Sequence, residues 1–272
     1  DYEDNFISDL LKRGWAVAMT NYEGLGTPGM HTYMVGRAEG HAVLDIARAA
    51  SRMAGTGLSP NGPIAVAGYS QGGGAAGWAA QLAPSYAPEL QLLGVAAGGV
   101  PADLAATVNA LNGGPFVVFA LLGGVGFDAA YPELQLSNYL NDQGRRLLSH
   151  ADTACLVNAG ALPVALQTPL RNIDDFTTTN PLHVPAWQSR IAENSLGTMT
   201  PTVPLFLYHG AADEIVPLGQ ARRLRQTWCA QGANIQWSLW PGEHVLTMQE
   251  ASSSVVNWLD DRFTGKPTTS NC

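Results

Sequence analysis

Short apolar runs that end in small or turn-forming residues recur along the chain and predict the strands of a buried sheet. Three of these runs lie in the first hundred residues, at 15–20, 64–69 and 90–96. Two more follow late in the chain, at 203–208 and 235–240. Continuous apolar runs of this length are typical of parallel strands that are covered on both faces.

Helical patterns separate the predicted strands. Apolar residues between positions 35 and 53 recur at spacings of three, four or eight, and they mark one face of a helix that stops near Gly55. Further helical patterns cover residues 219–231 and 246–263. A strand, a helix and a second strand at this spacing form a right-handed crossover in a parallel sheet. The chain is therefore predicted to be an α/β protein, with a mainly parallel sheet flanked by helices.

Residues 101–200 break this alternation, because Gly and Pro breakers stand among short helical segments there. We interpret this stretch as a helical cap or lid inserted into a core formed by residues 1–100 and 201–272. The total of 272 residues fits one large domain that carries an insertion.

Composition and charge exclude two classes of protein. Charged residues make up 13% of the chain, and 14 Lys and Arg against 22 Asp and Glu give a formal charge of −8. No run of basic residues forms a phosphate-binding stripe, so we expect no nucleic-acid partner. The longest apolar stretch, residues 113–127, is interrupted by glycines and a proline and is shorter than the roughly 20 residues of a membrane span. We therefore expect no transmembrane segment.

Residues 68–72 read Gly-Tyr-Ser-Gln-Gly and match G-x-S-x-G, the sharp strand-to-helix turn that exposes a nucleophilic serine in α/β-hydrolases. The buried-strand pattern at 64–67 precedes the turn, and small residues at 73–80 follow it. Ser70 is therefore the predicted nucleophile. The alternative is a Gly-rich turn with a bystander serine.

A serine nucleophile needs a histidine base, which in α/β-hydrolases follows the acid in chain order. His244 lies in the loop after the last predicted strand and is the predicted base, the alternative being a surface histidine with no role. His209 ends the preceding strand, with no acid at a comparable position before it. Asp213, in the loop between them, is the predicted acid. Its neighbour Glu214 is the alternative acid and is otherwise expected to be a solvated side chain.

The backbone N–H of Gln71 is predicted to donate to the oxyanion that forms when Ser70 attacks a carbonyl. A second donor in this fold comes from a loop after an early strand, and nothing before Trp15 can form that strand. We therefore expect the second oxyanion donor to lie outside this chain.

Three cysteines, Cys155, Cys229 and Cys272, have no metal-ligand spacing, and the simplest arrangement is one disulfide and one unpaired thiol. Cys229 ends a predicted helix and Cys272 is the last residue, so we predict a bond between them. The alternative is a terminal cysteine without a partner. Such a bond indicates an oxidising, extracellular or periplasmic compartment. No cofactor or metal is predicted.

Motifs spread along nearly the whole chain resemble the secretory lipase family of α/β-hydrolases. They are residues 22–24, 68–70, 85–90, 111–116, 213–217, 232–235 and 243–244. The resemblance implies a lipase or esterase with Ser70, Asp213 and His244 as its triad and with the insertion as an acyl-binding lid.

The chain also departs from the family pattern. Members carry about a hundred further residues before the first strand seen here, and members with a C-terminal flap continue past the position of Cys272. We therefore expect an N-terminal segment or separate chain that completes the fold. The resemblance implies that Cys155 pairs with a cysteine in that segment.

The apolar run at 116–122 lies in the insertion and is too apolar to face water. Phe116, Phe119 and Leu122 are the predicted acyl-binding residues. Ordinary packing of the cap on the core is the alternative.

These observations predict a secreted carboxylic ester hydrolase that cleaves lipids or other hydrophobic esters through an acyl-enzyme. One rival is an acyltransferase in which an alcohol outcompetes water for the same acyl-enzyme. The other rival is a catalytically silent hydrolase fold that binds lipid.

Overall fold

A computed structural model describes residues 3–149 and 168–272, and the chain divides into two compact units. The sheet unit consists of Asp1–Asn21, Gly40–Ala102 and Leu196–Cys272. The helical unit consists of Tyr22–Glu39 and Asp103–Ser195. Each unit has its own buried apolar core.

The sheet unit is built on four parallel strands in the order β1-β2-β3-β4. The strands are β1 (Pro63–Tyr69), β2 (Gln91–Gly98), β3 (Leu205–Gly210) and β4 (Ile235–Trp240). Their positions agree with four of the five predicted strands. Because all four run in parallel, their carboxyl ends lie along the same edge of the sheet, which is where ligands bind in open α/β sheets.

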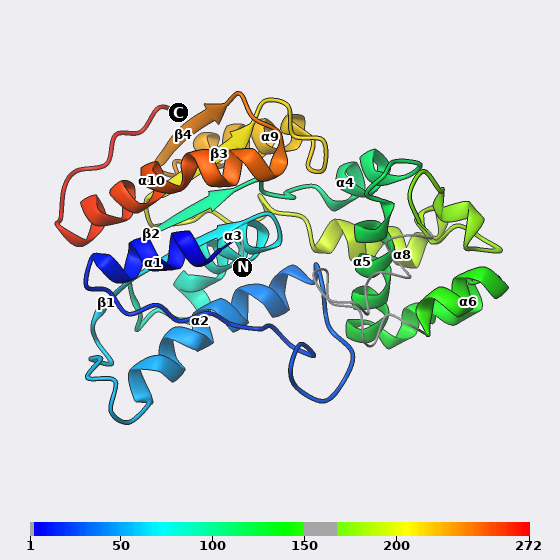
Figure 1. The fold of residues 1–272 in the computed structure, drawn as a ribbon, viewed down its shortest axis with the longest axis horizontal. Coiled ribbons are helices and arrows are strands. Elements are labelled where there is room, and N and C mark those ends of the chain that lie inside the picture. The colour runs from blue at the N-terminus through cyan, green and yellow to red at the C-terminus, as the bar shows by residue number, and fades with distance from the viewer. Residues whose placement is uncertain (1–2, 150–167) are drawn as a thin grey trace. The chain divides into compact units, whose positions relative to one another are not determined.

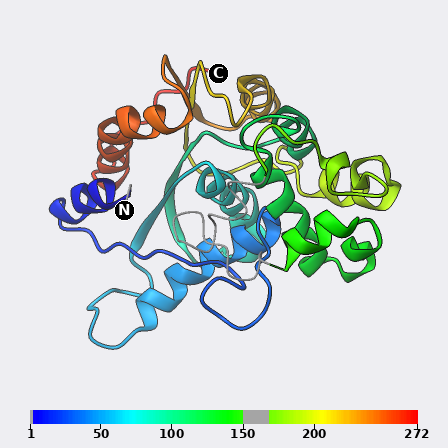
Figure 2. The same cartoon turned by 45° about the vertical axis from the view of Figure 1, so that its right-hand side comes forward.

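Helices cover both faces of this sheet. Helices α3 (Gln71–Tyr86) and α9 (Leu218–Ala230) contact the face that carries Val95 and Leu207. Helices α10 (His244–Phe263) and α1 (Asp4–Lys12) pack on the other face of the sheet, where they form a second apolar core with residues of the strands. Figures 1 and 2 show α1 in blue beside α10 in orange to red. Burial on both faces of the two central strands, β2 and β3, explains why these strands have continuous apolar sequences.

A further helix, α2 (Gly36–Arg52), runs from the helical unit into the sheet unit. Its Leu44 is fully buried and packs with Trp78 of α3. Arg48 of α2 donates to Asp45 at 2.7 Å and to Glu89 at 2.6 Å, beyond the end of α3. This helix agrees with the periodicity between positions 35 and 53.

The predicted strand at 15–20 is wrong. These residues are not in a strand, and no ladder joins them to β1, β2, β3 or β4. Trp15 and Val17 instead pack on the core beneath α10, and the Trp15 ring lies 4.7 Å from that of Phe263. The apolar side chains of such a run can therefore be buried by packing on a helix, whereas a strand also needs a neighbour that pairs with its backbone hydrogen-bonding groups.

The helical unit contains short helices around one apolar core, to which Leu104, Phe127 and Trp187 contribute. Asp103 caps one helix by accepting the Ala106 N–H at 3.0 Å. No single described helix is long and apolar enough to cross a bilayer. The helix Val117–Ala130 and residues Pro132–Asn138 reach that length and apolarity only together, as a pair bent by 111°. The helices that the structure describes within Asp103–Ser195 are α4 (Leu104–Leu111), α5 (Val117–Ala130), α6 (Asp142–Leu148), α8 (Pro185–Glu193) and the 3-10 turns Pro132–Leu134, Leu136–Asn138, Ile173–Asp175 and Pro181–His183.

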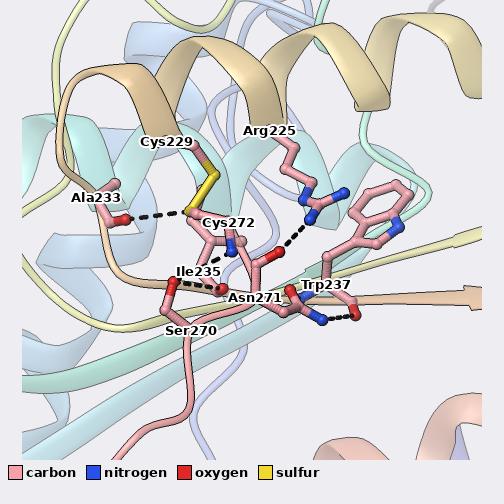
Figure 3. The surroundings of a disulfide bond; sticks show 8 residues. All are labelled: Arg225, Cys229, Ala233, Ile235, Trp237, Ser270, Asn271 and Cys272. Carbon is pink, nitrogen blue, oxygen red and sulfur yellow. Dashed lines mark hydrogen bonds between the residues drawn. A yellow bond between two sulfur atoms is a disulfide. The ribbon is translucent and has the colours of Figure 1, made fainter.

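The C-terminal tail lies along β4 and is hydrogen-bonded to it. The predicted disulfide between Cys229 and Cys272 is present at the end of this tail (Figure 3). The Asn271 N–H donates to the Ile235 carbonyl at 3.0 Å. Its side chain accepts from the Trp237 N–H at 2.8 Å and donates to the Trp237 carbonyl at 2.9 Å. The tail thus satisfies backbone groups at the edge of the sheet that would otherwise be open to another strand.

Removal of this disulfide in the double variant Cys229→Ser, Cys272→Ser should lower the free energy of unfolding. Its cysteines are 43 residues apart, and a closed loop of that size contributes roughly 4 kcal/mol in the chain-entropy model. Urea titration measures the loss. Asn271→Ala keeps the disulfide and removes only the side-chain bonds, so it should cost about 1 kcal/mol. Equal losses in the two variants would contradict the assignment of most of the stabilisation to the bond.

Candidate active site

A strained turn joins β1 to α3 and carries Ser70 at its tip. Ser70 has φ of +57°, a conformation that costs energy in any residue with a Cβ. The turn is closed so tightly that a Cβ on Gly68 would lie 2.0 Å from the Gly72 carbonyl oxygen. The Ser70 N–H donates to the Gly98 carbonyl at the end of β2 at 2.9 Å. These contacts explain why the motif needs glycine at its first position.

Helix α3 begins at Gln71, directly after the serine. The backbone N–H of Gln71 therefore lies at the positive end of the helix dipole, where negative charge is stabilised. The helix is composed of small residues from Gly73 to Ala76, all buried, so its axis can approach the sheet closely. This close packing of α3 on the sheet holds the turn that carries Ser70 in place.

The loops after β3 and β4 are joined to each other by backbone contacts. The Ala211 N–H donates to the Trp240 carbonyl at 2.6 Å, and the Ala212 N–H donates to the Gly242 carbonyl at 3.2 Å. A Cβ on Gly210 would lie 2.6 Å from the Gly242 carbonyl oxygen. Only glycine at position 210 therefore lets the two loops approach this closely.

The structure brings Ser70, Asp213 and His244 together in a continuous chain of hydrogen bonds. His244 Nε2 lies 2.9 Å from Ser70 Oγ, and His244 Nδ1 lies 2.7 Å from Asp213 Oδ2. Asp213 Oδ1 accepts the backbone N–H groups of Ile215 at 3.1 Å and Val216 at 2.7 Å. The carboxylate is fully buried, so these donors replace the water that it loses.

Two contacts hold the backbone of His244, and the sequence patterns did not indicate them. Glu214 is exposed as expected, but its Oε2 also accepts the His244 N–H at 3.1 Å. The Tyr69 hydroxyl donates to the His244 carbonyl at 2.6 Å, and burial raises the pKa of this phenol well above its ordinary value. No local signal could reveal the Tyr69 contact, because its partner lies 175 positions away.

This arrangement matches the requirements of nucleophilic catalysis. A hydroxyl lies within hydrogen-bond reach of a base, and a carboxylate in turn orients that base. Among the residues that the structure describes, no group of three or more His, Cys, Asp or Glu side chains is placed to hold a metal ion.

The predicted acyl-binding residues belong to the helical unit. Phe116 precedes α5 of the helical unit, and Phe119 and Leu122 lie within that helix. The rings of Phe116 and Phe119 stack with centroids 6.2 Å apart, and all three side chains are partly buried. Their acyl-binding role stays a prediction. Cys155 falls outside the described residues, and its pairing stays a prediction as well.

Comparison with known proteins places the chain in a family. A family model described as secretory lipase matches residues 1–271. A secreted triacylglycerol lipase of Malassezia furfur, LIP5, is 32% identical over 98% of this chain, and Lipase 4 of Candida albicans is 32% identical over 99%. The crystal structure of Candida antarctica lipase A in its closed state matches 88% of this chain with a TM-score of 0.78 and 32% identity.

These proteins are longer than the chain described here. It spans 71% of the Malassezia lipase, 60% of the Candida albicans lipase and 57% of the Candida antarctica enzyme. The resemblance inferred from the motifs is confirmed, and so is the α/β-hydrolase fold. The chain belongs to the secretory lipase family.

Proposed function

We propose that this chain carries the catalytic centre of a secreted carboxylic ester hydrolase that acts on lipids or other hydrophobic esters. The observation that supports the proposal best is the pair of hydrogen bonds that links Ser70, His244 and Asp213 beside the first turn of α3. The family membership supports ester hydrolysis as the reaction class.

The mechanism follows from the positions of these groups. Ser70 Oγ attacks the ester carbonyl carbon while His244 Nε2 takes up the hydroxyl proton. Asp213 keeps Nδ1 protonated and stabilises the imidazolium that forms. The Gln71 N–H donates to the carbonyl oxygen as it becomes negative. The imidazolium then protonates the departing alcohol, and an acyl-enzyme remains on Ser70.

Water completes the cycle by the same route. His244 removes a proton from water as the water oxygen attacks the acyl carbonyl. The tetrahedral intermediate then collapses to the free acid while His244 returns the proton to Ser70 Oγ. An alcohol in place of water would produce a new ester, so product analysis with and without added alcohol separates hydrolase from acyltransferase.

Secretion is proposed on two grounds. The matching family is described as secretory, and the Malassezia relative is named as a secreted lipase. The disulfide between Cys229 and Cys272 is of the kind that persists in oxidising compartments.

Ser70 should be the single residue that reacts with a fluorophosphonate probe, which peptide mapping can locate. Ser70→Ala should lower kcat for a p-nitrophenyl ester by about a million-fold, as nucleophile removal does in other triads. Labelling of another residue, or a largely active Ser70→Ala enzyme, would disprove the assignment.

Asp213 and Glu214 form a matched pair of neighbouring carboxylates. Asp213→Asn should lower kcat by about 10⁴-fold, because an amide can donate to Nδ1 and favours the wrong imidazole tautomer. Glu214→Gln keeps an oxygen that can accept the His244 N–H, so its kcat should stay within about tenfold of the original. Steady-state kinetics on both variants shows which of the two carboxylates acts as the triad acid. A reversed order of effects would assign the acid role to Glu214.

Phe119→Ala should shift the acyl chain-length preference towards longer esters if this ring lines the acyl site, because removal of the ring lengthens the space open to the acyl chain. A p-nitrophenyl ester series measures the profile. Val117→Ala on the same helix is the control, since Val117 is fully buried and its loss should reduce stability alone. An unchanged profile in Phe119→Ala would favour ordinary packing.

A further inference from the structure

A second histidine, His209, lies beside the carboxylate of Asp213 and takes no part in the proposed proton transfers. It is the penultimate residue of β3, and its side chain is fully buried. Its Nε2 lies 2.9 Å from the Val216 carbonyl oxygen and 3.4 Å from Asp213 Oδ2. The same Oδ2 accepts from His244, so one carboxylate oxygen lies between two imidazole rings.

The contacts of His209 determine where its proton is. A carbonyl oxygen can only accept a hydrogen bond, so Nε2 carries hydrogen and donates to Val216. Burial lowers the pKa of His209, which keeps the ring neutral and leaves this as its single N–H. Nδ1 is then a buried acceptor, and it has no hydrogen-bond partner among the described residues.

A buried ring nitrogen without a partner destabilises a fold, and an apolar side chain would fill similar space without this penalty. The cost of a histidine at this position is explained if its one N–H stabilises a part of the structure that the site needs. The N–H of His209 donates to the turn that surrounds Asp213, because its acceptor Val216 also donates its own N–H to Asp213 Oδ1 at 2.7 Å.

We infer that His209 is a positioning residue for Asp213, an inference that rests on the proposed function of the triad. Its N–H fixes the Val216 carbonyl and thereby the amide N–H groups that bind Oδ1. The positive edge of its ring lies beside Oδ2, which it keeps directed at His244. Because the ring is neutral, it does not compete as a cation with the His244 imidazolium for the same carboxylate.

Two substitutions separate this role from simple packing. His209→Leu keeps much of the volume and removes the donor, and it should lower kcat for a p-nitrophenyl ester by about 10- to 100-fold with little change in KM. His209→Gln places an amide N–H near the position of Nε2 and should recover activity to within about threefold. If His209→Leu does not fold, His209→Asn replaces it, because the shorter amide cannot reach Val216.

Two further measurements report on the triad itself. The far-downfield proton signal of the hydrogen bond between His244 and Asp213 should weaken in His209→Leu and persist in His209→Gln. The acidic limb of the kcat/KM profile should move to lower pH in His209→Leu, since a poorly placed carboxylate stabilises the imidazolium less. A purely structural role would change neither observable.

Controls make the outcomes distinct. Val95→Ala lowers stability from within the core, and His183→Gln exchanges an exposed histidine in the helical unit; both should keep the original NMR signal and pH profile. The inference is overturned if His209→Leu behaves like Val95→Ala, or if His209→Gln loses as much activity as His209→Leu. If Ser70→Ala stays active in the same assay, the proposed function fails instead, and the NMR signal still tests His209.

Discussion

The close backbone contact between the loops after β3 and β4 is the constraint on which the candidate active site depends. Gly210 and the Gly242 carbonyl approach so closely that no side chain fits between them. Asp213 lies in the first loop and His244 directly follows the second, so this contact sets the distance between carboxylate and imidazole. Ser70 reaches the same point from the strained turn before α3, and that turn is tied to the end of β2.

Polar groups around Asp213 make a buried carboxylate tolerable. Two backbone N–H groups bind one oxygen, and His244 binds the other. His244 is itself held at both backbone groups, by Glu214 and by Tyr69. A site held in this way needs little rearrangement when charge develops during a reaction, which is the condition for electrostatic stabilisation of a transition state.

The C-terminal tail solves a separate problem at the edge of the sheet. β4 has no strand beyond it among the described residues, and an open edge invites association with other chains. Asn271 makes hydrogen bonds to β4 of the kind that a neighbouring strand would make. The disulfide at the next residue holds Asn271 in position for them. An extracellular protein can rely on such a bond, because no reducing system opens it there.

Local patterns in the sequence alone determined four strands, the helices between them, the turn at Ser70 and the order of Asp213 and His244 after it. These features depend on residues close together in the chain, so spacing and residue type are enough to indicate them. The sequence also indicated the disulfide, because Cys229 lies at the end of the helix before the last strand and Cys272 is the last residue.

Tertiary structure alone decided which apolar segments pair as strands and which polar groups hold the site. Residues 15–20 have the apolar run of a strand, but they form none and Trp15 and Val17 pack on the core beside α10, since backbone pairing depends on a partner that the segment itself does not encode. The Tyr69 hydroxyl donates to an acceptor 175 positions away, and the contacts of the His209 imidazole form only in the folded loop that carries Asp213. Periodicity cannot show such contacts. The Tyr69 contact joins distant segments, and the His209 contacts depend on how the loop after β3 turns back on the end of that strand.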